Sequence, residues 1–214
     1  MKSDHSALVQ QAADYLAKHD PVLASVIKAH PLPTFVPHTN YYQELVESII
    51  SQQLSVKAAS AIEKRFIGLF EDQFPSPEQI LSRSIEEFRS VGLSRPKAAY
   101  VQDLARNVLD GTVKFDTLDQ LSNDEIIAEL TKVKGIGEWT VHMFLMFCMG
   151  RLDVLPIGDL GIRNGVQKLY SFDHALLPQE VTLLAEANKW APYQSVASWY
   201  VWQSLDNAPK LETT

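Results

Sequence analysis

Apolar residues recur at helical spacing along nearly the whole of this sequence. Leu8, Ala12 and Leu16, for example, follow one another at intervals of one helical turn and share one face of a helix expected over residues 4–18. The same spacing predicts further helices that start near Pro21, Tyr42, Ser55, Ser76, Ser84, Ser94, Ser122, Glu138, Asp159, Pro178 and Ser195. The pattern therefore predicts an all-α protein.

Polar residues at the starts of these helices fit the usual capping patterns. A serine followed three residues later by glutamate or glutamine predicts a capping box, and this pattern occurs at Ser76, Ser84 and Ser122. Asp20 directly before a proline predicts an N-cap followed by proline at the first helical position. Residues 112–116 alternate weakly between apolar and polar side chains, which predicts one short strand.

The segment 130–149 organises the rest of the chain. Its first helix halts at Gly135-Ile136-Gly137, where glycines suit a tight reversal because they take positive φ at little steric cost, and a very apolar helix follows from Glu138. A helix, a Gly-x-Gly turn and a second helix leave backbone N–H groups pointing outward, which is one way to bind a phosphate. An ordinary turn between two helices has the same pattern. Both interpretations stand on these residues alone.

Composition and charge limit the possible partners. A chain of 214 residues, 46% of them hydrophobic, can bury a core in one domain or in two modest lobes. Its net charge of −7 argues against a general polyanion binder. Contact with DNA would therefore depend on local basic residues and on backbone donors.

The sequence lacks the residues for several other kinds of site. Cys148 is the one cysteine, which excludes an internal disulfide and a four-cysteine zinc or iron–sulfur site. The histidines show no metal-binding spacing, so we expect no metal held by side chains. The N-terminus has no signal-peptide pattern, and the apolar run at 141–149 is too short to span a bilayer. We expect an intracellular protein, in the cytoplasm and nucleoid or in a nucleus.

Asp159 is a candidate for chemistry. It stands where a loop becomes a helix, which is typical of an N-cap. A carboxylate held at that position also has a fixed direction and can face a substrate. Trp139 and Trp202 belong to an aromatic-rich last third of the chain, where such residues either form the core or stack on flat bases.

Several motifs in this order resemble the helix-hairpin-helix DNA glycosylase superfamily. They are Leu130-x-x-Val133-x-Gly135-Ile136-Gly137-x-Trp139-Thr140 with Asp159 downstream, Ser51-Gln52-Gln53-Leu54-Ser55, Gly92-Leu93-Ser94 with Lys97-Ala98, and Trp190-x-Pro192-x-x-Ser195 with Trp202. Together they resemble the 3-methyladenine DNA glycosylase II family in its compact all-α form, over about residues 41–205.

The resemblance implies two helical lobes with a cleft between them. One lobe would be the six-helix part over residues 41–149, which ends with the helix-hairpin-helix unit. The other would combine residues 1–40 with residues 150–214. The proline-rich segment 30–38 cannot be helical, and it lies where the chain should cross between the lobes.

The resemblance also implies the activity: a monofunctional glycosylase that hydrolyses the N-glycosidic bond of alkylated purines in double-stranded DNA and leaves an abasic site. The damaged base would be flipped out of the duplex, and Asp159 would be the catalytic carboxylate that stabilises the developing sugar cation. The base pocket would be formed by Trp139, Trp202, Gln52, Met143 and Leu160.

In the same family, Gln53 would fill the gap left in the base stack, and the hairpin would hold phosphate. The DNA-binding residues implied are Gln53, Ser55, Lys134, Gly135, Ile136, Gly137 and Thr140. Family members also show a monovalent cation on the hairpin carbonyls, which implies Na⁺ or K⁺ near Gly135 and Gly137 and no other cofactor. We expect a monomer with damaged double-stranded DNA as its partner.

This chain departs from the family at a few positions. Gln194 stands where members often carry arginine, and Met143 and Leu160 stand where some members have tyrosines, which gives a more apolar pocket wall. Two other functions stay open. A non-catalytic helix-hairpin-helix DNA-binding module would give Asp159 no role. A bifunctional glycosylase with lyase activity would need an amine nucleophile where this chain has Trp139.

Overall fold

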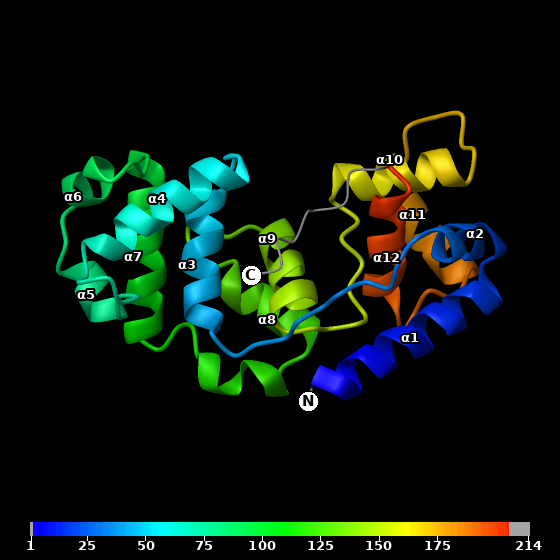
Figure 1. Cartoon of the computed structure of the whole chain (residues 1–214), viewed down its shortest axis with the longest axis horizontal. Helices are drawn as coiled ribbons and strands as arrows, with labels where there is room; N and C mark the ends of the chain where they lie inside the picture. Colours follow the sequence, from blue (N-terminus) through cyan, green and yellow to red (C-terminus); the bar gives the residue numbers. More distant parts are fainter. Residues whose placement is uncertain (1, 206–214) are drawn as a thin grey trace. The chain divides into compact units, whose positions relative to one another are not determined.

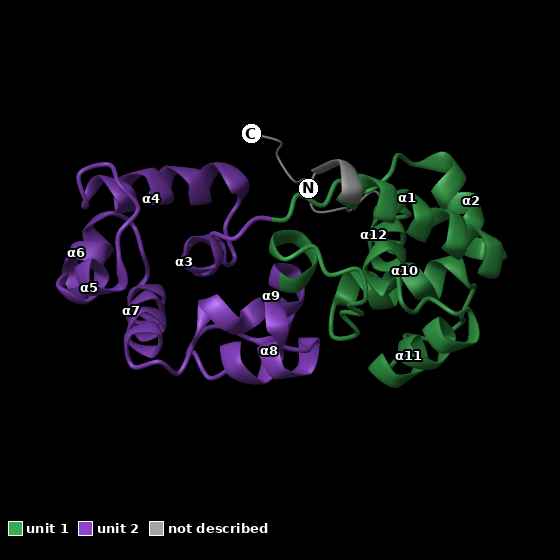
Figure 2. Ribbon diagram, turned by 90° about the horizontal axis from the view of Figure 1, so that it is seen from below, with its two compact units in different colours: residues 1–37, 145–214 green, residues 38–144 purple. Residues whose placement is uncertain are grey.

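The computed structural model describes residues 2–205, and every regular element in that range is helical, which confirms the all-α class (Figure 1). The chain divides into two compact units. Unit 1 comprises residues 1–37 and 145–214, and unit 2 comprises residues 38–144 (Figure 2). The expected boundaries lay a few residues further along the chain. Residues 145–149 belong with unit 1, where the ring of Phe147 packs against Phe35 and Trp202, with centroids 5.6 and 6.3 Å away.

Unit 2 is built around its longest helix. Its elements are α3 (Tyr41–Ser51), α4 (Val56–Gly68), α5 (Pro77–Leu81), α6 (Ile85–Ser90), α7 (Arg95–Leu109), the 3-10 helix η1 (Phe115–Gln120), α8 (Asn123–Leu130) and α9 (Glu138–Met143). Helix α7 packs against α3, α5 and α6, because Val101, Leu104 and Ala105 form a fully buried face. Phe88 of α6 and Ile49 of α3 complete this core.

The capping predictions are confirmed. Ser76, Ser84 and Ser122 each form a capping box, and Asp20 accepts from the first-turn N–H groups of the helix that follows it. The predicted strand at residues 112–116 is wrong. Its backbone N–H groups bond to α7 and to a side chain of α8 rather than to a partner strand, and the chain turns into η1.

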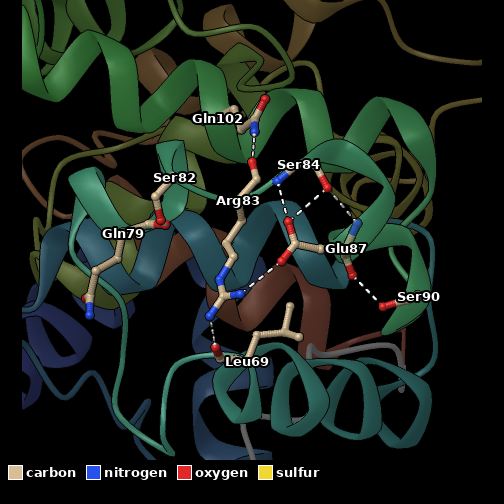
Figure 3. Close-up of polar contacts among 8 residues, drawn as sticks. All are labelled: Leu69, Gln79, Ser82, Arg83, Ser84, Glu87, Ser90 and Gln102. Carbon is tan, nitrogen blue, oxygen red and sulfur yellow. Dashed lines mark hydrogen bonds and ion pairs between the residues drawn. The ribbon is translucent and has the colours of Figure 1, made fainter.

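Arg83 joins three elements of unit 2 (Figure 3). Its guanidinium donates to Glu87 at 2.9 Å and to the carbonyl of Leu69 at 2.8 Å, and its own carbonyl accepts from Gln102 of α7 at 2.7 Å. A hollow of about 240 Å³ lies beside these residues. Since the charged group of Arg83 is already bonded within the fold, we assign the hollow to the packing between these elements and not to a ligand site.

Unit 1 surrounds its last helix. Its elements are α1 (Lys2–His19), α2 (Pro21–Ala29), α10 (Leu160–Leu169), α11 (Pro178–Ala187) and α12 (Gln194–Gln203), and the π-helical turn η2 (Phe144–Cys148) leads into it from α9. Residues 195–202 are buried without exception, because α1, α2 and α10 all pack on α12. Among the described residues, none of the helices has the length and apolar character needed to cross a membrane.

A buried carboxylate fastens the N-terminal helices to this unit. Asp20 caps α2 through one oxygen, and its other oxygen accepts from the hydroxyl of Tyr170 and, at 2.8 Å, from the indole nitrogen of Trp190. Burial and the bond to Asp20 raise the pKa of the Tyr170 hydroxyl. Asp20 is therefore a structural group whose hydrogen bonds offset the cost of burying it.

Candidate active site

The Gly-x-Gly turn connects α8 and α9 as predicted, but its two glycines play different parts. Gly135 has φ of +87°, and a Cβ there would lie 2.2 Å from the ring of Tyr100. Gly137 has φ of −96° and is the N-cap of α9, and a Cβ there would meet nothing within 4 Å. Positive φ is thus needed at Gly135 alone. The openness around Gly137 is what leaves its backbone accessible.

The hairpin presents few side chains to solvent. Ile136 is buried and anchors the turn, whereas Lys134 and Trp139 are exposed, Trp139 to 52%. Thr140 is half-buried in the first turn of α9. The exposed surface of the turn consists of backbone around Gly137, the Lys134 ammonium, the Glu138 carboxylate and the Trp139 indole ring.

A second exposed turn lies between α3 and α4. Gln53 is exposed there with φ of +57°, a conformation that residues other than glycine rarely adopt. Gln52 is half-buried, and its side-chain amide donates to the carbonyl of Gly135 at 2.8 Å. Ser55 caps α4 by accepting from the N–H of Ala58. The two turns, distant in sequence, are therefore bonded to each other within unit 2.

Asp159 is the N-cap of α10 and is also held from another helix. Its Oδ1 accepts from the N–H of Ile162 at 2.8 Å and from the indole nitrogen of Trp202 at 2.9 Å. Gly161 makes this possible, because a Cβ there would lie 2.9 Å from that oxygen and 3.1 Å from the Trp202 ring. Two donors from different elements fix the carboxylate in one direction.

Comparison with known proteins identifies the family. Residues 46–192 match the family model described as HhH-GPD superfamily base excision DNA repair protein. The chain is also similar to DNA-3-methyladenine glycosylase 1 of Schizosaccharomyces pombe, with 38% identity over 76% of this chain and 72% of the relative. The chain belongs to the HhH-GPD superfamily.

Solved structures agree with this membership and with the 3-methyladenine glycosylase family within it. A DNA-3-methyladenine glycosidase from Bacillus halodurans has a TM-score of 0.80 and 36% identity, covering 90% of this chain and 88% of that one. The 3-methyladenine DNA glycosylase of Schizosaccharomyces pombe, solved in complex with abasic DNA, has a TM-score of 0.72 and 33% identity, covering 90% of this chain and 95% of that one.

The structure of this HhH-GPD member places the expected site residues in both units. The hairpin residues, Gln52, Gln53, Ser55, Trp139 and Met143 lie in unit 2, whereas Asp159, Leu160 and Trp202 lie in unit 1. Leu160 is 61% exposed beside Asp159, Met143 is half-buried, and Trp202 is only 4% exposed. That Trp139 and Trp202 hold one base between them stays a prediction.

Sequence reasoning missed the residues that support this glycosylase site from behind. For Gly161 the sequence contains one signal, because a glycine in the first turn of a helix is less favourable than alanine. For Tyr100 and Asp103 the sequence contains no such signal, because no local sequence pattern shows that α7 packs against the hairpin. Asp103 accepts from the N–H of Lys134 at 2.9 Å.

Proposed function

We propose that this protein excises alkylated purines such as 3-methyladenine from double-stranded DNA by hydrolysing the N-glycosidic bond, and leaves an abasic site. The observation that carries the proposal is the Asp159 carboxylate, which is held by the first turn of α10 and by the Trp202 indole. The names of the relatives and membership of a base excision repair family support the substrate class.

The chemistry needs little from the protein beyond a positioned negative charge. An alkylated purine carries positive charge on its ring, so its bond to the sugar is already weakened. As the bond breaks, positive charge develops on the sugar, and a carboxylate fixed beforehand stabilises that charge without reorganising. Asp159 meets this requirement because two N–H donors hold one of its oxygens. The same carboxylate can orient the attacking water.

DNA would be held by the two exposed turns of unit 2. The backbone around Gly137 and the ammonium of Lys134 offer donors to phosphate. Gln53, which is exposed in the other turn, would fill the gap that a flipped nucleotide leaves in the base stack. Ile136 and Thr140 would support and extend the hairpin contact.

The base pocket in this proposal combines aromatic and apolar side chains. Trp139 and Trp202 would receive the electron-poor base between their π faces, with Met143 and Leu160 as apolar walls. Gln52 has a second role besides the expected one. Its amide is bonded to Gly135, so we assign it to holding the hairpin as well as to lining the pocket.

The product should be an intact strand with an abasic site. A lyase step needs an amine nucleophile, and Trp139 occupies the position where bifunctional relatives of this fold would carry it. Borohydride added during the reaction should therefore trap no protein–DNA adduct on a denaturing gel. A trapped protein–DNA band formed by the wild-type protein would overturn this part of the proposal.

Three further expectations belong to the same proposal. A Na⁺ or K⁺ ion would bind hairpin carbonyls near Gly135 and Gly137 and help to hold phosphate. The protein would act as a monomer, and it would act where cellular DNA is kept.

The experiment uses methylated duplex DNA and chromatography of the released bases. The wild-type protein should release 3-methyladenine under single-turnover conditions. Asp159→Asn keeps the shape and a capping oxygen but removes the charge, and it should slow base release by about 10²–10³ while the melting temperature holds, because asparagine caps nearly as well as aspartate. A folded Asp159→Asn protein with normal base release would reduce Asp159 to a cap.

A further inference from the structure

We propose that one face of α7 holds the Gln52–Gln53 turn and the 134–137 hairpin in a fixed arrangement before DNA binds. The face is formed by Lys97, Tyr100 and Asp103. Lys97 is the positioning residue of this arrangement. The inference rests on the proposed function, since it assigns a role to groups behind the DNA-contacting surface. It concerns residues that do not themselves contact substrate.

Lys97 is bonded to the C-terminal end of α3. Its ammonium donates to the carbonyl of Ile50 at 2.8 Å and to that of Gln52 at 2.6 Å. Carbonyls in the last turn of a helix have no partner within the helix, and a cation there is favoured by the helix dipole. Burial lowers the pKa of Lys97, which agrees with an ammonium group turned inward. Two of its three N–H donors are therefore used inside the fold.

The turn that Lys97 holds needs external support. Gln53 follows directly after the bonded carbonyl of Gln52 and has φ of +57°. Positive φ is disfavoured for a residue with a side chain and persists where neighbouring contacts impose it. The two bonds from Lys97 supply that constraint, so that Gln53 is presented in one direction.

The same face of α7 holds the hairpin. Residues 97, 100 and 103 follow at intervals of three along the helix and therefore lie on one side of it. The Tyr100 ring occupies the space where a Gly135 side chain would be, and the buried Asp103 carboxylate accepts from the N–H of Lys134 at 2.9 Å. These contacts set the position of the hairpin backbone relative to α7.

A direct bond closes the arrangement. The Gln52 amide donates to the carbonyl of Gly135, so each turn is attached to α7 and to the other turn. Inserting a side chain into the stack and gripping a nearby phosphate require a fixed distance between the two groups. Preorganising both loops avoids the cost of ordering them when DNA binds.

The test compares Lys97→Met with wild type on duplex and on single-stranded methylated DNA. Base release from the duplex should fall at least about tenfold, because Lys97→Met removes two charge-assisted hydrogen bonds. Release from single strands should change less than about twofold, because no stack has to be filled there. The slope of log affinity against log salt on undamaged duplex should be unchanged. Lys97→Gln, which can still donate to a carbonyl, should lie between the two proteins.

Chemical rescue and a matched control complete the design. Lys97→Cys treated with bromoethylamine regains an ammonium group of nearly lysine length and should recover duplex activity, since the chain's own Cys148 is buried. Lys64→Met, which removes an exposed lysine from α4 of the same unit, should retain wild-type rates.

Several results would overturn the inference. A salt slope reduced by about 1 would make Lys97 a phosphate contact. If the rate of base release falls equally on duplex and single strands, Lys97 has only a structural role. If the rate falls on neither, Lys97 has no role in the reaction. If wild type releases no base, the proposed function fails. The inference is then decided by affinity for a duplex with a synthetic abasic site, which should still fall at least about tenfold in Lys97→Met.

Discussion

Gly161→Ala separates stability from activity in a way that the structure makes quantitative. The added Cβ would lie 2.9 Å from Oδ1 of Asp159 and 3.1 Å from Cδ1 and Nε1 of Trp202, whereas ordinary contact begins near 3.4 Å. Either the carboxylate or the indole must therefore move by a few tenths of an ångström, and the 2.9 Å bond between them lengthens or breaks.

The expected cost to catalysis follows from that bond. A hydrogen bond to a charged group contributes about 1.5–3 kcal/mol, and each 1.4 kcal/mol corresponds to about tenfold in rate. Base release by Gly161→Ala should therefore fall by about 10- to 100-fold. Stability should change little, because alanine is up to about 1 kcal/mol more favourable than glycine in a helix and offsets part of the crowding.

The assay is single-turnover release of methylated base, with thermal unfolding of the same preparation. Gly158→Ala is the matched control. A Cβ at Gly158 meets nothing within 4 Å although the residue lies next to Asp159, so both its rate and its melting temperature should match wild type. Wild-type base release by Gly161→Ala would refute the argument that the Trp202 bond positions the carboxylate.

Two further predictions test the hairpin and the pH dependence of unit 2. Gly135→Ala should lower the melting temperature, because residue 135 has positive φ and a Cβ there would meet the Tyr100 ring. Gly137→Asp should stay folded, since aspartate is a better N-cap than glycine, but it should bind undamaged duplex more weakly; equal affinity would contradict the phosphate assignment. Burial, with a smaller contribution from neighbouring Glu63, raises the pKa of Glu47 to about 7, so the folded state binds a proton that the unfolded state releases at lower pH. The melting temperature should consequently fall as pH rises from about 5 to about 8, and Glu47→Gln should flatten that fall; an unchanged profile would contradict it.

Local chemistry in the sequence was enough for the helices and their ends. The capping boxes at Ser76, Ser84 and Ser122, and the cap at Asp159, involve residues within one helical turn, so their side chains and backbone partners are set by sequence spacing alone. The hairpin at Gly135 is local for the same reason. The strand expected at residues 112–116 failed because a strand needs a partner, and no local pattern supplies one.

The support of the site was decided by tertiary structure. The bond from Trp202 to Asp159 joins residues 43 apart, and the bond from Gln52 to Gly135 joins residues 83 apart. The first bond depends on how α12 packs on α10, and the second depends on how the two turns pack on α7. Helical periodicity in the sequence shows only that one face of a helix is buried. The sequence by itself thus determined the candidate carboxylate and the turns, whereas packing alone determined what holds them in place.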